Sequence, residues 1–192
     1  MHIMKKYWIY LAGCIALGAV AAFVACDDED HTSKSTEFQR MEMSFNYAVS
    51  EDLLAVADIL ITYTDPAGVI TTPTAPLDVL SWSKNFSSES LPAGFEVTVE
   101  VEMKEGITLD KSSYTLTQRW SEEFLEYRSD GKVHWRDKDA DEVFTQTFTS
   151  NPDDPDALLQ QITTAVGLMS RTYRYMVALD PDGTGYEVTD ND

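Results

Sequence analysis

Cysteine, histidine and basic residues are scarce in this sequence. Among 192 residues there are two cysteines, three histidines, and 14 lysines and arginines against 33 aspartates and glutamates, which gives a formal net charge of −19. Both cysteines lie in or beside the first apolar stretch, which excludes a disulfide scaffold and a cysteine-based zinc site. The excess of negative charge excludes nucleic acid as a partner, because too few cations are present to neutralise a run of phosphates.

The few histidines also argue against catalysis. His2 and His31 lie in the first 31 residues, so His134 is the only histidine in the remainder of the chain. Nucleophilic triads and zinc centres need several such groups side by side. We therefore expect a protein that is not an enzyme, with His134 as an ordinary surface residue. A small hydrolase that uses two carboxylates is the alternative, although spacing decides nothing where acids are this common.

The first 26 residues have the layout of an export segment. Lys5 and Lys6 precede the apolar run 7–25, and small residues lead to Cys26. A basic start, an apolar middle and a small-residue end predict a signal peptide over residues 1–25. An uncleaved membrane helix is the alternative, because the run is long enough to span a bilayer.

The sequence Phe23-Val24-Ala25-Cys26 resembles the lipobox of bacterial lipoproteins, with phenylalanine where leucine is usual. In that family the peptide before the cysteine is removed, the thiol carries a diacylglycerol and the new amino terminus is acylated. The resemblance implies a covalent lipid on Cys26, no other cofactor, and stable membrane attachment through several acyl chains. Cys14 is a second candidate, but its use leaves an apolar core of only about seven residues and a second apolar run on the mature chain.

Acidic residues follow directly: Asp27, Asp28, Glu29 and Asp30. They resemble the export signal that sends some Gram-negative lipoproteins to the outer face of the outer membrane. The resemblance implies a surface-exposed, lipid-anchored protein of the cell outer membrane, and a solvated linker is the alternative. The polar composition predicts a flexible tether over 26–38 and a single domain over 39–192.

Alternation of apolar and polar residues dominates this domain. It is clearest from Phe95 to Lys104, where every second residue is apolar, as in a sheet with one wet face. Residues 53–64 are apolar on both faces and predict a central strand. About eight such stretches, separated by turn signals such as Asp130-Gly131, predict an all-β fold. The pattern resembles immunoglobulin-like two-sheet sandwiches of secreted bacterial proteins; a closed barrel is the alternative.

One segment near the C-terminus has a different period. After Asp154-Pro155-Asp156, apolar residues recur at helical spacing from Leu158 to Met169. This pattern predicts one short helix over about 155–168, with a loop as the alternative.

Three aspartates form the clearest pattern that points to a metal. Asp137, Asp139 and Asp141 have the spacing of the first half of an EF-hand loop. Glu142 replaces the turn glycine, however, and Phe148 stands where the bidentate glutamate belongs. We expect these acids to form a turn, with bound calcium as the weaker alternative.

Aromatic residues offer a surface for recognition. Trp82 and Trp120 fall on the apolar side of their strands, so we expect them in the core. Trp135 and Tyr127 flank the Asp130-Gly131 hairpin and are the candidate surface for a protein or glycan partner. The expected function is therefore a lipid-anchored binding or structural module, with a subunit of a larger envelope assembly, joined through a sheet edge, as a further alternative.

Overall fold

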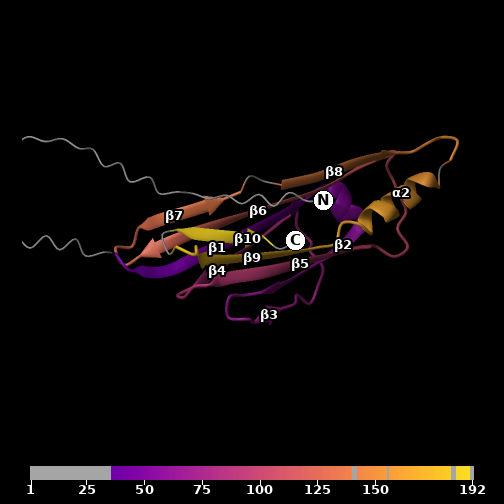
Figure 1. The fold of residues 1–192 in the computed structure, drawn as a ribbon. Coiled ribbons are helices and arrows are strands. Elements are labelled where there is room, and N and C mark those ends of the chain that lie inside the picture. Colours follow the sequence, from indigo (N-terminus) through magenta and orange to yellow (C-terminus); the bar gives the residue numbers. More distant parts are fainter. Residues whose placement is uncertain (1–35, 140–141, 155, 183–184, 191–192) are drawn as a thin grey trace, which may run out of the picture.

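A computed structural model describes residues 36–139, 142–154, 156–182 and 185–190. Two antiparallel five-stranded sheets lie face to face, and their inner faces form the core (Figure 1). The prediction of an all-β, two-sheet sandwich with a short helix near the C-terminus is confirmed. The two sheets keep separate edges, so the alternative of a closed barrel is wrong.

Each sheet combines strands from both halves of the chain. The first sheet has the order β4-β1-β6-β7, and β8 also pairs with β6. Its strands are β1 (Phe38–Val49), β4 (Ser81–Ser88), β6 (Ser113–Arg128), β7 (Val133–Lys138) and β8 (Glu142–Thr149). The second sheet has the order β10-β9-β5-β2-β3. Its strands are β2 (Ala57–Thr64), β3 (Ile70–Thr71), β5 (Ala93–Met103), β9 (Arg171–Leu179) and β10 (Tyr186–Asp190).

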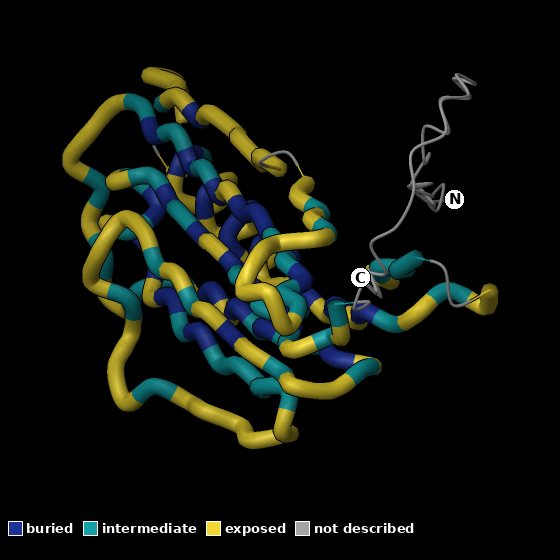
Figure 2. Tube along the Cα trace, turned by 90° about the vertical axis from the view of Figure 1, so that its left-hand side faces the viewer, coloured by how far each residue is buried: buried dark blue, intermediate teal, exposed yellow. Residues whose placement is uncertain are grey.

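Aromatic rings fill much of the space between the sheets. The ring of Phe45 on β1 lies 5.0 Å from that of Tyr173 on β9, and Phe95 on β5 stacks on Phe86 at 4.5 Å. Figure 2 shows how buried positions alternate with exposed ones along the strands. The core position predicted for Trp120 is confirmed by its 6% exposure, whereas Trp82 is half-buried. Burial of such rings supplies a large share of the hydrophobic stabilisation.

The helix near the C-terminus, α2 (Ala157–Val166), confirms the helical spacing found in the sequence. Its apolar face is buried, and Asp156 occupies the N-cap position without a capping hydrogen bond from its side chain. Asp154 lies before the helix. Pro155 lies outside the described residues.

A second helix, α1 (Glu51–Val56), corrects the prediction of a continuous strand over 53–64. The Ser50 side chain accepts a hydrogen bond from the Leu53 N–H at 3.2 Å, and Glu51 and Asp52 lie at the positive end of the helix. Leu53 and Val56 are buried. Apolar residues on successive positions therefore belong to one turn of helix, and strand β2 begins only at Ala57.

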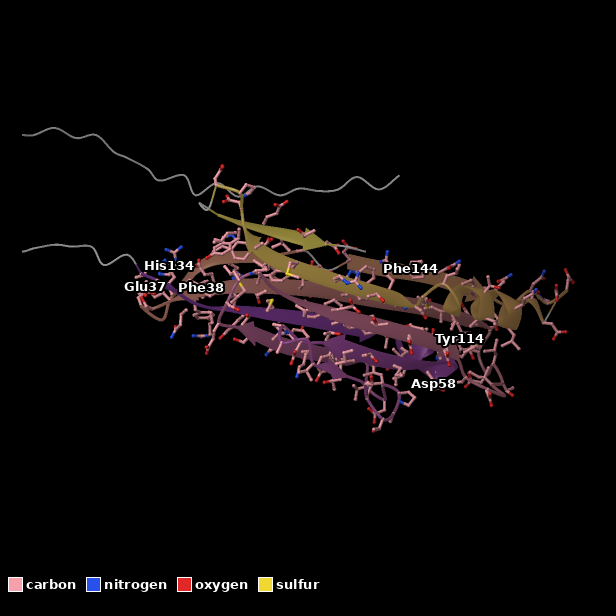
Figure 3. The ribbon with its side chains drawn as sticks, turned by 60° about the horizontal axis from the view of Figure 1, so that its bottom comes forward. Glu37, Phe38, Asp58, Tyr114, His134 and Phe144 are labelled. Atoms are coloured by element: carbon pink, nitrogen blue, oxygen red, sulfur yellow. The ribbon has the colours of Figure 1, made fainter. Side chains whose placement is uncertain are left out.

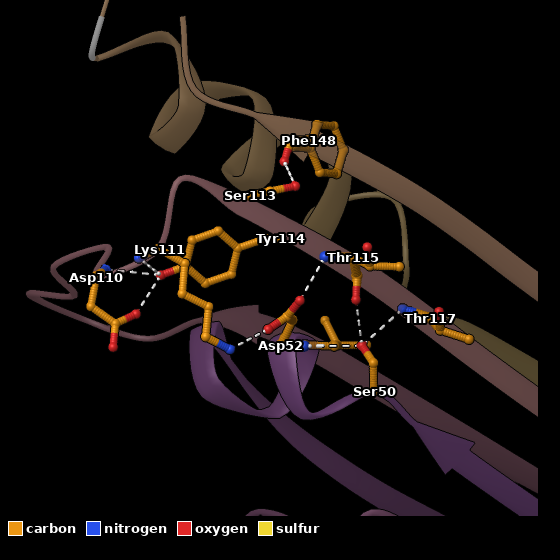
Figure 4. A network of polar contacts seen from close by, with 10 residues as sticks. Ser50, Asp52, Asp110, Lys111, Ser113, Tyr114, Thr115, Thr117 and Phe148 are labelled. Carbon is orange, nitrogen blue, oxygen red and sulfur yellow. Dashed lines mark hydrogen bonds and ion pairs between the residues drawn. The ribbon is translucent and has the colours of Figure 1, made fainter. Parts of the chain in front are cut away.

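Side chains at the start of α1 also complete the hydrogen bonding of β6 (Figure 4). The β1–β6 ladder ends at the pair Val49 and Gln118. Beyond it, the Ser50 hydroxyl donates to the Thr115 carbonyl at 2.8 Å and accepts from the Thr117 N–H at 3.0 Å. The Asp52 carboxylate accepts from the Thr115 N–H at 2.7 Å. Two side chains thus satisfy backbone groups that a longer β1 would otherwise pair.

Removal of the Ser50 hydroxyl should therefore cost more than the loss of one surface contact. Ser50→Ala is expected to lower the free energy of unfolding by about 1–2 kcal/mol, because a helix cap and two β6 backbone groups lose their partner. Urea denaturation measures the change. Ser87→Ala, at an exposed position of β4, is the matched control and should change stability by less than about 0.5 kcal/mol. Equal effects of the two substitutions would contradict this role of Ser50.

Candidate functional site

The predicted signal peptide, Cys26 and the acidic residues 27–30 lie outside the described residues. The lipid anchor therefore stays a prediction from the sequence. Within the described part of the chain, neither helix has the length and apolar character that crossing a membrane requires.

The two candidate aromatic residues of the β6–β7 hairpin do not form one patch. Trp135 pairs with the buried Glu126, and its ring lies 5.0 Å from that of Tyr186 on β10. Tyr127, the next residue along β6, points to the opposite face, because successive residues of a strand alternate. The Arg40 guanidinium lies 4.1 Å from the centre of its ring. Both aromatic side chains are half-buried and have neighbours of their own.

His134 is a surface residue of the same hairpin, as predicted. Its Nε2 lies 2.9 Å from Asp130 Oδ2 in the turn. Figure 3 shows His134 at the end of the sandwich where β1 begins, near Glu37 and Phe38. This contact helps to fix the turn, in which Gly131 has a φ of +75°.

Asp137 and Asp139, two of the three calcium candidates, lie beside a break in the edge of the first sheet. Strands β7 and β8 both pair with the same side of β6, one after the other. Lys138 pairs with Glu123, and Glu142 pairs with Trp120. Three residues separate Lys138 from Glu142 along the chain, whereas two residues separate Trp120 from Glu123. Asp137 and Asp139 border this break, and Asp141 lies outside the described residues.

Opposite the break, β6 turns a carboxyl group toward the core. Glu122 is only 7% exposed, and burial followed by the charge of Asp139 raises its pKa to about 8, although a hydrogen bond from Tyr175 offsets part of the shift. Burial and Asp139 also raise the pKa of Asp137. Glu122 therefore holds a proton near neutral pH and is the most strongly perturbed carboxyl group in the described part of the chain.

A metal site is not assembled from these groups alone. Among the described residues, no three histidines, cysteines, aspartates or glutamates are placed to hold one ion. Because Asp141 is not described, calcium stays a prediction from the sequence.

A shallow hollow of about 280 Å³ lies on the outer face of the first sheet. Its floor is formed by three consecutive residues from each of the neighbouring strands β1, β4 and β6, namely 46–48, 81–83 and 119–121. The middle residues Tyr47, Trp82 and Trp120 pair with one another and point inward. The side chains on the outer face therefore line the hollow: Asn46, Ala48, Ser81, Ser83, Arg119 and Ser121.

Small side chains explain why the hollow exists. Serine and alanine occupy adjacent outward positions on three strands, so little fills the space above the sheet. The polar groups around it are hydroxyls, an amide and the Arg119 guanidinium, which together can donate and accept hydrogen bonds. This arrangement suits a neutral ligand with several hydroxyl groups.

Comparison with known proteins does not identify the hollow. No family model matches the chain, and neither the curated proteins nor the solved structures compared with it gave a match.

Glu122 and the hollow were both missed in the sequence. Glu122 had a usable signal, because it lies between Trp120 and Phe124 at the spacing of inward residues. The hollow had none, because it needs the register of three strands that are far apart in the chain.

The buried carboxyl group predicts a specific dependence of stability on pH. Folding raises the pKa of Glu122, so the protonated side chain stabilises the folded state at acidic pH. This stabilisation is lost as the pH rises toward and past about 8. Glu122→Gln should remove this loss. The stability gained by the variant relative to the wild type should therefore grow between about pH 5 and pH 9, by at most about 1.4 kcal/mol per pH unit.

Urea denaturation at several pH values measures this difference. Glu102→Gln, at an exposed position of β5, is the control and should show a small difference that does not vary with pH. A constant difference for Glu122→Gln would show that Glu122 is ionised normally.

Proposed function

We propose that this protein is a lipid-anchored binding module of a bacterial cell envelope, attached through Cys26 and displayed at the outer face of the outer membrane. One observation carries the proposal: a basic start, an apolar run, Ala25-Cys26 and four acidic residues follow one another in the sequence. Each part has its place in lipoprotein export, and the order leaves the lipid at the boundary between the apolar and acidic segments. The sandwich then acts outside the membrane without catalysing a reaction.

The position of the folded domain is compatible with this arrangement. Strand β1 starts at Phe38, so residues 27–37 would separate the lipid from the sandwich. An extended chain of that length reaches at most about 35–40 Å. Such a tether would allow the sheet faces and edges to meet a partner away from the membrane surface.

The hollow on the first sheet supports a glycan as the ligand. Its hydroxyl, amide and guanidinium groups match the hydroxyls of a sugar. The net charge of −19 repels anions, so a neutral sugar is favoured. The alternative of a carboxylate-dependent hydrolase has less support, because none of the described residues that line the hollow carries a carboxylate.

The anchor is tested by substitution of its thiol. Cys26→Ser is expected to abolish both the incorporation of labelled palmitate and the removal of residues 1–25, because the serine oxygen cannot replace the sulfur that carries the diacylglycerol. Cys14→Ser is the matched control and should be labelled and anchored like the wild type. Normal labelling of Cys26→Ser would overturn the assignment, and loss of labelling in Cys14→Ser alone would move the anchor to Cys14.

The glycan site is tested by filling the hollow. Ser83→Trp places a large ring in it and should weaken binding at least about tenfold, or about 1.4 kcal/mol. Ser87→Trp is the matched control, because Ser87 is exposed on the same face of β4 but outside the hollow. The full-length protein is tested for binding to immobilised neutral oligosaccharides. If none of them binds, or if both variants bind like the wild type, the hollow is not a glycan site.

A further inference from the structure

Strand β8 is an edge strand that lacks the usual protection against pairing. Within the described part of the chain it pairs only with β6, and it runs along the upper border of the first sheet in Figure 1. Residues 143–149 include no charge, proline or glycine. Val143 is 49% exposed and Phe144 41% exposed. Natural proteins normally protect such edges with charged residues, prolines or irregular backbone.

The neighbouring part of the same edge shows this protection. Strand β7 carries His134, Arg136 and Lys138 on alternate positions, and the opposite edge strand of the sheet, β4, carries Lys84. Among the edge strands of the first sheet, only β8 thus has a long stretch without charge, although the chain as a whole is rich in charge. The unprotected edge is therefore a specific feature of this segment.

The hydrogen bonds of β8 show which backbone groups face outward. The Ser150 N–H donates to the Ser112 carbonyl, and the Phe148 carbonyl accepts from the Ser113 hydroxyl at 3.0 Å. Backbone groups alternate in direction along a strand, so the even-numbered residues 142–150 face β6. The N–H and C=O groups of Val143, Thr145, Thr147 and Thr149 consequently point away from β6.

The side chains of β8 form a palindrome around Gln146. The sequence from Phe144 to Phe148 is the same in both directions: Phe-Thr-Gln-Thr-Phe. In an antiparallel pair of two β8 strands centred on Gln146, Phe144 lies opposite Phe148 and Thr145 lies opposite Thr147. In this register the outward-facing N–H and C=O groups of Thr145 lie opposite those of Thr147 in the second copy, and those of Val143 lie opposite those of Thr149. The side-chain palindrome and the backbone hydrogen bonds therefore require the same register.

We propose that two copies of this protein associate through β8, in antiparallel pairing about a twofold axis at Gln146. The two five-stranded sheets then form one continuous sheet, held by about eight main-chain hydrogen bonds. On the outer face, the hydroxyl pairs Thr115–Thr147 and Thr117–Thr145 within each copy extend across the new interface. On the inner face, the exposed Phe144 ring of each copy packs against Phe148 of the second copy.

The distribution of charge favours a second copy as the occupant. Glu142 is the only charged residue of β8, and in this register it lies opposite Ser150, so no like charges meet along the pair. The net charge of −19 still makes the two molecules repel each other at a distance. Because salt screens this repulsion and leaves the hydrogen bonds intact, the dimer should become tighter as the NaCl concentration rises.

A cysteine at the axis tests the register. The two Gln146 residues form a non-hydrogen-bonded pair, in which Cα atoms lie about 4.5 Å apart, within the range that a disulfide spans. Under mild oxidation, full-length Gln146→Cys is expected to form a disulfide-linked dimer. Wild-type protein, whose own cysteines are Cys14 and Cys26, and Ser87→Cys, which has its added cysteine exposed on β4 outside the hollow, are the controls and set the level of crosslinking that does not pass through β8. A Gln146→Cys protein that gives no more crosslinking than these controls would overturn the proposed register.

A charge at the edge tests the association itself. Thr147→Lys introduces two ammonium groups close to the axis and should weaken dimerisation by about tenfold or more in sedimentation equilibrium of the full-length protein. Ser87→Lys adds the same charge at an exposed position of β4 outside the hollow and should dimerise like the wild type. Circular dichroism melting checks that both variants fold. A wild type that is monomeric up to about 100 μM, or a Thr147→Lys variant that dimerises equally well, would refute the β8 interface. Each variant and its control keep the same first 26 residues, so the difference between them is independent of the proposed anchor.

Discussion

The length of β6 is the constraint on which the rest of the structure depends. This strand runs from Ser113 to Arg128, and no single neighbour pairs with all of it. On one side β1 stops at Val49, and the side chains of Ser50 and Asp52 complete the hydrogen bonding. On the other side β8 and β7 divide the strand between them. Helix α1 and the break in pairing between Lys138 and Glu142 both lie where a neighbour of β6 ends.

The inner face of β6 also explains why polar residues occur in the core. Gln118, Glu122 and Glu126 all lie on the inward side, where a polar group needs a partner to offset its loss of water. The Gln118 Nε2 donates to the Met169 carbonyl at 2.9 Å, and Glu126 accepts from the Arg128 side chain at 2.8 Å. Glu122 lies among carboxylates and keeps its proton instead. Burial of one carboxyl group thus makes stability depend on pH in a range where ordinary carboxylates no longer titrate.

The sequence predicted the parts of the fold that depend on local periodicity. The alternation from Phe95 to Val101 and the helical spacing after Leu158 gave the right elements, because burial on one face imposes its period on the sequence. Helix α1 was missed because one helical turn and a buried strand are both apolar on successive residues, although the serine and two acids before Leu53 were a usable signal. The hollow and the palindromic register of β8 depend on pairing between distant segments, which local patterns do not determine.

The proposed function joins an anchor that is argued from the sequence to a binding surface that is argued from the structure. The proposed anchor is the central claim, because it would place the hollow and the β8 edge outside the cell. The most direct test is the intact mass of the wild-type protein extracted from membranes. The account predicts a polypeptide that begins at Cys26 and carries the added mass of its acyl chains. A protein that keeps Met1, or that begins at another residue without lipid, would contradict it.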